Sequence, residues 1–66
     1  MSKYNLTPAK LIKLLQKNGF VFTRQNGSHA IFRNEEKQRK VVVPIHSKDI
    51  PKGTLHAILK DAGIHL

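Results

Sequence analysis

The chain has 66 residues, 39% of them hydrophobic, which predicts one domain over residues 1–66 with a core too small for a deep cofactor cavity. It contains no cysteine, so disulfide bonds, thiolate zinc sites and cysteine nucleophiles are excluded. Twelve Lys and Arg against four Asp and Glu give a net charge of +8 and a pI of about 10.4, which is typical of proteins that bind nucleic acids.

The first predicted element is a helix that begins at Thr7 and Pro8, since threonine is a good N-cap and proline is favoured at the first helical position. Its apolar face is formed by leucines with helical spacing, Leu11, Leu14 and Leu15. Three basic side chains fall on the opposite side, Lys10, Lys13 and Lys17. We expect Gly19 to end the helix in a left-handed conformation, with Phe20 packing back on the helix.

Three β-strands follow the helix. Residues 20–24 are rich in β-forming side chains, and residues 25–28 predict a turn because Asn-Gly is a strong hairpin signal. Residues 29–33 predict a second strand, and residues 39–45 predict a third strand after a charged turn. Pro44 cannot donate a backbone hydrogen bond, so we expect it near the end of a strand or on a sheet edge.

A second helix closes the chain, and we expect Pro51 in its first turn. Its apolar face repeats with helical spacing at Leu55, Ile58, Leu59 and Ala62. Gly63 is expected to end this helix, which lets Ile64 pack back on Leu59.

The predicted order is α-β-β-β-α, a fold of the α+β class. Two amphipathic helices need a shared apolar surface, so we expect both on one face of a three-stranded antiparallel sheet, with the other face open. In the second strand, Ala30 and Phe32 are more apolar than the alternating set that contains His29. Alternation therefore predicts Phe32 in the core and His29 on the open face.

The available side chains favour proton-transfer chemistry on RNA over metal-assisted hydrolysis. Cleaving RNA without a metal needs a base for the 2′-hydroxyl, an acid for the leaving oxygen and cations for the phosphate, and histidine can serve in both proton roles. Metal-dependent hydrolysis needs clustered carboxylates, whereas two of the four acidic residues lie in a turn, Glu35 and Glu36, and Asp49 and Asp61 each stand alone. We therefore expect no metal and no cofactor.

His29 and His46 are the candidate proton-transfer residues. If the second turn is centred between residues 36 and 37, His29 pairs with Pro44, and His46 becomes its diagonal neighbour at about 7–8 Å. A similar count for the first hairpin sets Arg24 opposite His29, where it would supply a cation to the phosphate. Arg24, however, shares strand parity with the apolar Phe22, a conflict that a β-bulge near the turn would resolve.

Other polar residues have two open interpretations. Lys10, Lys13 and Lys17 are either phosphate contacts or a solvated helix face. Ser28 is interpreted as a turn residue or a phosphate contact, since a serine nucleophile would need a nearby carboxylate. The two remaining histidines are weaker candidates, one on the polar side of the last helix and one in the tail, His56 and His65.

Several short elements occur in a fixed order along the chain: Gly19-Phe20, Arg24, Gly27-Ser28-His29, Phe32, Val43-Pro44 with His46, Gly53-Thr54-Leu55, Ile58-Leu59 and Ala62-Gly63-Ile64. In this order they resemble the HicA family of toxin–antitoxin systems, over about residues 7–64. The resemblance implies a fold similar to the double-stranded-RNA-binding domain. It also implies a small toxin that cleaves messenger RNA, arrests translation and is blocked by a HicB antitoxin.

The resemblance assigns the essential histidine of the family to His29, within the Gly-Ser-His element. Gly27 and Ser28 match the same element, and we interpret Gly27 as permitting a positive φ or close approach of the RNA backbone. His46 matches a recurrent position of the family, and its role as the partner acid is our own hypothesis.

Three functions compete at this stage. The favoured one is a metal-independent endoribonuclease with RNA and an antitoxin as partners. The alternative is a non-catalytic RNA-binding module of the same fold. A third is a small basic protein that binds an acidic partner. We expect a cytoplasmic protein, because residues 1–7 lack the apolar stretch of a signal peptide and no apolar run approaches 18 residues.

Overall fold

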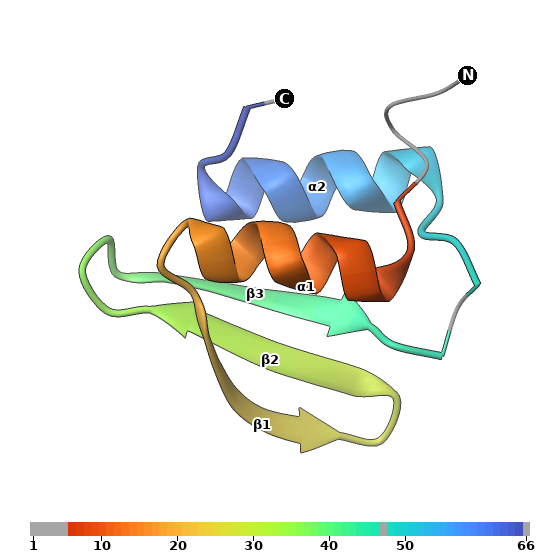
Figure 1. Cartoon of the computed structure of the whole chain (residues 1–66), viewed down its shortest axis with the longest axis horizontal. Helices are drawn as coiled ribbons and strands as arrows, with labels where there is room; N and C mark the ends of the chain where they lie inside the picture. Colours follow the sequence, from red (N-terminus) through yellow and green to blue (C-terminus); the bar gives the residue numbers. More distant parts are fainter. Residues whose placement is uncertain (1–5, 47, 66) are drawn as a thin grey trace.

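The computed structural model describes residues 6–46 and 48–65, and its elements follow the predicted α-β-β-β-α order (Figure 1). The elements are α1 (Pro8–Lys17), β1 (Val21–Asn26), β2 (His29–Asn34), β3 (Arg39–Pro44) and α2 (Lys52–Ala62). Residues 1–5, 47 and 66 lie outside the described residues. They include part of the domain predicted over residues 1–66 and most of the polar segment at residues 1–7.

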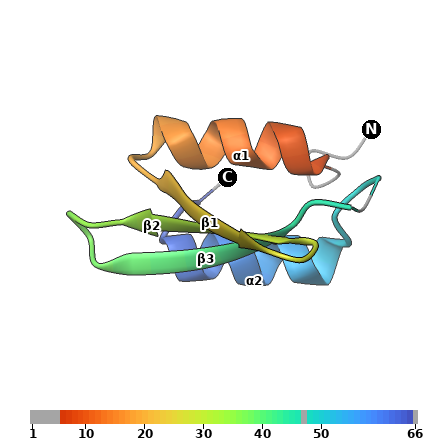
Figure 2. The ribbon, with the colours of Figure 1, turned by 90° about the horizontal axis from the view of Figure 1, so that it is seen from below.

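The three strands form an antiparallel sheet in the order β1-β2-β3, and both helices pack on one face of it. Every second residue of β2 and β3 is buried, at Ala30, Phe32, Val41 and Val43. Both helices contribute to the same core through Leu11, Leu15, Leu55, Ile58, Leu59 and Ala62. Figure 2 shows α1 across one side of the sheet and α2 alongside β3. The predicted arrangement, with two helices on one face, is confirmed.

Local hydrogen bonds explain where α1 begins and ends. Thr7 caps the first turn, because its Oγ1 accepts a hydrogen bond from the Lys10 N–H at 3.2 Å. At the other end Gly19 has a φ of +88°, and the Phe20 N–H donates to the Leu15 carbonyl at 3.0 Å. This is the predicted glycine stop, which turns Phe20 into the core beneath the helix.

The same device ends α2, where Gly63 has a φ of +74° and the Ile64 N–H donates to the Leu59 carbonyl at 2.9 Å. Arg39 of β3 adds a contact across the fold, because its Nη1 donates to the Asp61 carbonyl at 3.0 Å. A cation is stabilised at a helix C-terminus, where carbonyl groups lack helical partners. Arg39 therefore ties the end of α2 to the sheet.

The first hairpin is tighter than the sequence predicts. β1 continues to Asn26, which pairs with His29, so the loop contains only Gly27 and Ser28. Gly27 has a φ of +63°, the arrangement of a two-residue hairpin with glycine at the first central position. The prediction of a turn over residues 25–28 is therefore wrong by two residues, because Asn26 belongs to the strand and Gly27 alone supplies the left-handed conformation.

Candidate functional site

The face of the sheet opposite the helices is a surface of mixed polar and apolar residues, built from alternate residues of all three strands. Following the cross-strand pairs, β2 presents His29, Ile31 and Arg33 on this open face, and β3 presents Lys40, Val42 and Pro44. β1 adds Val21, Arg24 and Asn26. His29 is exposed here and Phe32 is buried on the other face, which confirms the prediction made from alternation.

His29 lies at the first position of β2, held between two neighbouring strands. It pairs with Asn26 on β1 and with Pro44 on β3. The Ile45 N–H donates to the Ser28 carbonyl at 2.9 Å, so the His29–Pro44 pair is of the type without mutual hydrogen bonds, in which side chains lie closer together. Proline fits this position because no N–H is required of it. The predicted register of the second hairpin is confirmed.

Arg24 shares the open face with His29 but does not pair with it. It lies opposite Ile31, so the predicted pairing with His29 is wrong by two residues along β2. The register shifts between Phe22 and Arg24, which marks a β-bulge. Such a bulge resolves the conflict seen in the sequence, because Phe22 and Arg24 would otherwise lie on the same face of the strand. Because of this bulge, Phe22 lies on the core face, 5.8 Å from the ring of Phe32, while Arg24 is a diagonal neighbour of His29 at about 7–8 Å.

His46 lies beyond the end of β3. The strand ends at Pro44, and His46 occupies the exposed turn that follows, one residue after Ile45. The backbone bond from Ile45 to Ser28 holds this turn at the same end of the sheet as His29. The structure therefore brings the two histidines to one end of the sheet, but the strand ladder does not extend to His46.

The loop before His29 leaves space above it. Gly27 is exposed, and a Cβ built on it would meet no atom within 4 Å. Gln25 steadies the loop, because its Nε2 donates to the Gly27 carbonyl at 3.0 Å. The positive φ of Gly27 is confirmed as the reason for glycine, and the open space is compatible with the close approach of a ligand.

Two further cations on this face were not among the site residues predicted from the sequence. Arg33 and Lys40 form a cross-strand pair, and together with Arg24 they surround a hollow of about 260 Å³ next to Ile31. Arg33 also pairs with Glu35, with Nε and Oε2 3.1 Å apart. The signal that could have found them is their alternation with His29 along β2 and across to β3.

A match to a protein-family model shows which family the chain belongs to. The family model described as HicA toxin of bacterial toxin-antitoxin matches residues 8–64, which include all five elements. This chain belongs to the HicA toxin family. Membership in HicA implies a toxin–antitoxin partner, and the family resemblance seen in the sequence is confirmed. A comparison with curated proteins gives no match.

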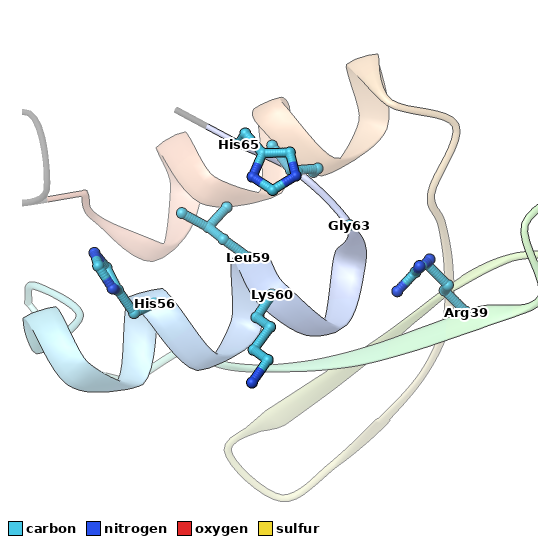
Figure 3. Close-up of a pocket in the computed structure, with 7 residues that line it drawn as sticks. Arg39, His56, Leu59, Lys60, Gly63 and His65 are labelled. Carbon is cyan, nitrogen blue, oxygen red and sulfur yellow. The ribbon is translucent and has the colours of Figure 1, made fainter.

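Several other basic residues in the described part of this HicA chain lie away from the open face. Lys10, Lys13 and Lys17 are exposed on α1, which packs on the opposite face of the sheet. His56, Lys60 and His65 line a separate hollow of about 470 Å³ beside α2, together with Arg39 (Figure 3). The structure therefore separates the helix lysines and these two histidines from His29.

The described part of the HicA chain contains neither a metal-binding cluster nor a membrane-spanning helix. Within residues 6–46 and 48–65, His, Asp and Glu side chains form no group of three or more that could hold a metal ion. No helix in the same residues is long and apolar enough to cross a membrane.

Proposed function

We propose that this HicA-family toxin is an endoribonuclease that cleaves messenger RNA without a metal and thereby inhibits translation. The observation that carries the proposal is the position of His29, which is exposed on the open face with Arg24 of β1 as its diagonal neighbour. His29 also stands in the Gly27-Ser28-His29 element to which the family resemblance assigns the essential histidine. Membership of the family supports the same reading.

The reaction that fits these groups begins at the 2′-hydroxyl of the RNA. The 2′-oxygen forms a bond to the adjacent phosphorus while its proton passes to a base, and the bond from phosphorus to the 5′-oxygen breaks while that oxygen takes a proton from an acid. His29 serves in one of these proton transfers, and His46 is the proposed partner for the other. Arg24 stabilises the negative charge that develops on the phosphate oxygens.

The proposed partners follow from the same face. Messenger RNA is the substrate, which sets the reaction in the cytoplasm, and an antitoxin of the HicB type neutralises the toxin by covering the open face. A net charge of +8 suits both an RNA and an acidic protein surface. We propose no cofactor, because the two proton transfers and the charge on the phosphate are served by side chains.

Replacement of His29 tests the proposal directly. The purified chain is incubated with a mixed RNA in EDTA, and the His29→Ala variant is compared with the matched control His65→Ala. We expect His29→Ala to lose about 10²–10⁴-fold in cleavage rate, since a positioned acid or base contributes that much, and to keep its RNA affinity and melting temperature. His65→Ala cleaves like the unchanged chain.

Other outcomes overturn particular parts of the proposal. An unchanged chain that binds RNA without cleaving it is an RNA-binding module, the alternative function. Cleavage that needs a divalent cation contradicts the metal-independent reaction. Full activity in His29→Ala removes His29 from the chemistry, and full activity in His46→Ala removes His46 as the partner acid.

A further inference from the structure

A hollow on the open face lies beside His29 and has no assigned role. It has a volume of about 260 Å³ and is lined by residues of all three strands: Thr23, Arg24, Ile31, Arg33 and Lys40. Ile31 is two residues from His29 on the same face of β2, a separation of about 7 Å along the strand. The nearest lining residue on β2, Ile31, is therefore the next residue after His29 on the same face of that strand.

The β-bulge in β1 shapes this hollow. Thr23 is the extra residue between Phe22 and Arg24, and it shifts the alternation so that Arg24 reaches the open face. Without the bulge, Arg24 would lie with Phe22 on the core face, and the hollow would lack one of its cations. Bulges of this kind re-aim a side chain, and here the result is a third cation on the open face.

The lining combines an apolar floor with three positive charges. Ile31 is half-buried at the centre, and Arg24, Arg33 and Lys40 stand around it, one cation from each strand. Glu35 is the partner of Arg33, but both side chains are exposed, so water and salt weaken this ion pair. The hollow keeps a net positive charge, which favours an anionic ligand that also carries an apolar surface.

We propose that this hollow is a subsite for the nucleotide that neighbours the cleaved bond in a single-stranded RNA. The inference rests on the proposed function, because it takes His29 as the residue at the cleaved bond. Arg33 lies about 13 Å from His29 along β2, and Lys40 is its cross-strand neighbour on β3. An RNA strand that follows β2 therefore carries its next phosphates between these two cations. The base or ribose of that nucleotide rests on Ile31.

The shape of the subsite selects a single strand over a duplex. Unstacked bases of single-stranded RNA can enter a hollow and contact its floor, whereas the bases of a duplex are paired and stacked. The three cations contact phosphates and give affinity without reading sequence. A single strand therefore gains both the apolar and the ionic contacts, and a duplex gains only the ionic ones.

Binding measurements in the His29→Ala background test the subsite while the RNA stays intact. Arg24→Gln and Lys40→Gln are compared with Lys13→Gln, which removes the same charge from α1 on the opposite face. We expect the two open-face variants each to weaken single-stranded RNA binding by about 3–10-fold and to reduce the salt slope by about 0.7, the value for one lost phosphate contact. Lys13→Gln leaves both quantities nearly unchanged.

A second readout locates the ligand in the hollow. In NMR titrations of the His29→Ala chain with a short single-stranded RNA, the methyl resonances of Ile31 shift more than those of Ile12, which lies on α1 beyond the opposite face of the sheet. A duplex RNA of equal charge shifts Ile31 less than the single strand does. Equal shifts for both RNAs contradict the role of Ile31 as the floor for a nucleotide.

The outcomes separate this inference from the proposed function. If the unchanged chain does not cleave RNA but Arg24→Gln and Lys40→Gln weaken binding selectively, the hollow binds single-stranded RNA, and both the nuclease and the place of the hollow beside a cleaved bond are overturned. If His29 is essential for cleavage and all three charge variants bind alike, the subsite is overturned. If a polyglutamate peptide competes as well as RNA of equal charge, the hollow recognises charge alone, and the nucleotide subsite is overturned as well.

Discussion

At the scale of single residues, Asn34 joins three parts of the chain through one buried amide. Its side chain is only 3% exposed. Its Nδ2 donates to the Asn18 carbonyl at 2.9 Å, and its Oδ1 accepts the Lys37 N–H at 3.0 Å. Asn34 therefore holds the end of α1 over the sheet and also shapes the turn between β2 and β3.

Replacing Asn34 with alanine tests this link. The change leaves the Asn18 carbonyl and the Lys37 N–H without their partner, and an unsatisfied polar group in a part-buried position costs about 1–3 kcal/mol. We expect the free energy of unfolding in urea to fall by about that amount. The matched change Glu36→Ala, in the exposed turn, stays within about 0.5 kcal/mol. Equal effects of the two changes would contradict the linking role.

Single residues also show what sequence patterns can and cannot predict. The exposure of His29 was readable, because alternation along β2 is uninterrupted from His29 to Asn34. For Arg24 the conflict of parity with Phe22 indicated a bulge, but the residue opposite Arg24 was not readable, because the sequence does not show where the bulge shifts the register. The role of Asn34 depends on Asn18, which is 16 residues away in the chain, so only the folded arrangement shows it.

At the scale of elements, the glycines of the helices have opposite requirements. Gly63 ends α2 with a φ of +74°, and a Cβ there would lie 3.1 Å from Nε and Cζ of Arg39. Gly53 lies in the first turn of α2, and a Cβ on it would meet nothing within 4 Å. Of these two glycines in and after α2, Gly63 is therefore the one that backbone conformation and space require.

Alanine at these two positions should have effects of opposite sign. Gly63→Ala forces a left-handed conformation on a residue with a Cβ, which costs about 1–2 kcal/mol, and displaces Arg39 from the end of α2. Gly53→Ala should stabilise the helix by about 0.5–1 kcal/mol, because alanine loses less backbone entropy than glycine. Thermal melts of both variants measure the difference. A lower melting temperature for Gly53→Ala would show that the glycine has another role.

Element order was predictable, whereas some element ends were not. The helix ends followed from residues with one strong conformational preference, such as Thr7, Gly19 and Gly63. The end of β1 was misplaced because an Asn-Gly pair fits several hairpin turns, and the choice among them depends on how the strands pair. Here the pairing of Asn26 with His29 makes Gly27 the first loop residue.

At the scale of the whole molecule, positive charge lies on both sides of the sheet. Arg24, Arg33 and Lys40 lie on the open face, while the exposed lysines of α1 lie beyond the core. Only one side can contact a given stretch of RNA closely. We therefore expect the number of ions released on binding to reflect the open face rather than the full net charge of +8.

The salt dependence of RNA binding measures this difference. Three phosphate contacts on a single strand give a slope of about −2 for log affinity against log salt, so affinity should fall by about 20-fold between 50 and 200 mM salt. Anisotropy titrations of the His29→Ala chain at several salt concentrations provide the slope. A slope near zero would contradict an ionic RNA interface, and a slope much steeper than −2 would mean that the lysines of α1 also bind.

The three strands follow one another along the chain without interruption, from Val21 to Pro44. Every residue assigned to the proposed chemistry and to the subsite therefore comes from one continuous stretch that ends at His46. The helices before and after this stretch pack against the core face of the sheet. The outward residues of α1 and α2 can therefore be substituted during evolution, for instance to suit a new binding protein, while the residues of the proposed site and subsite stay the same.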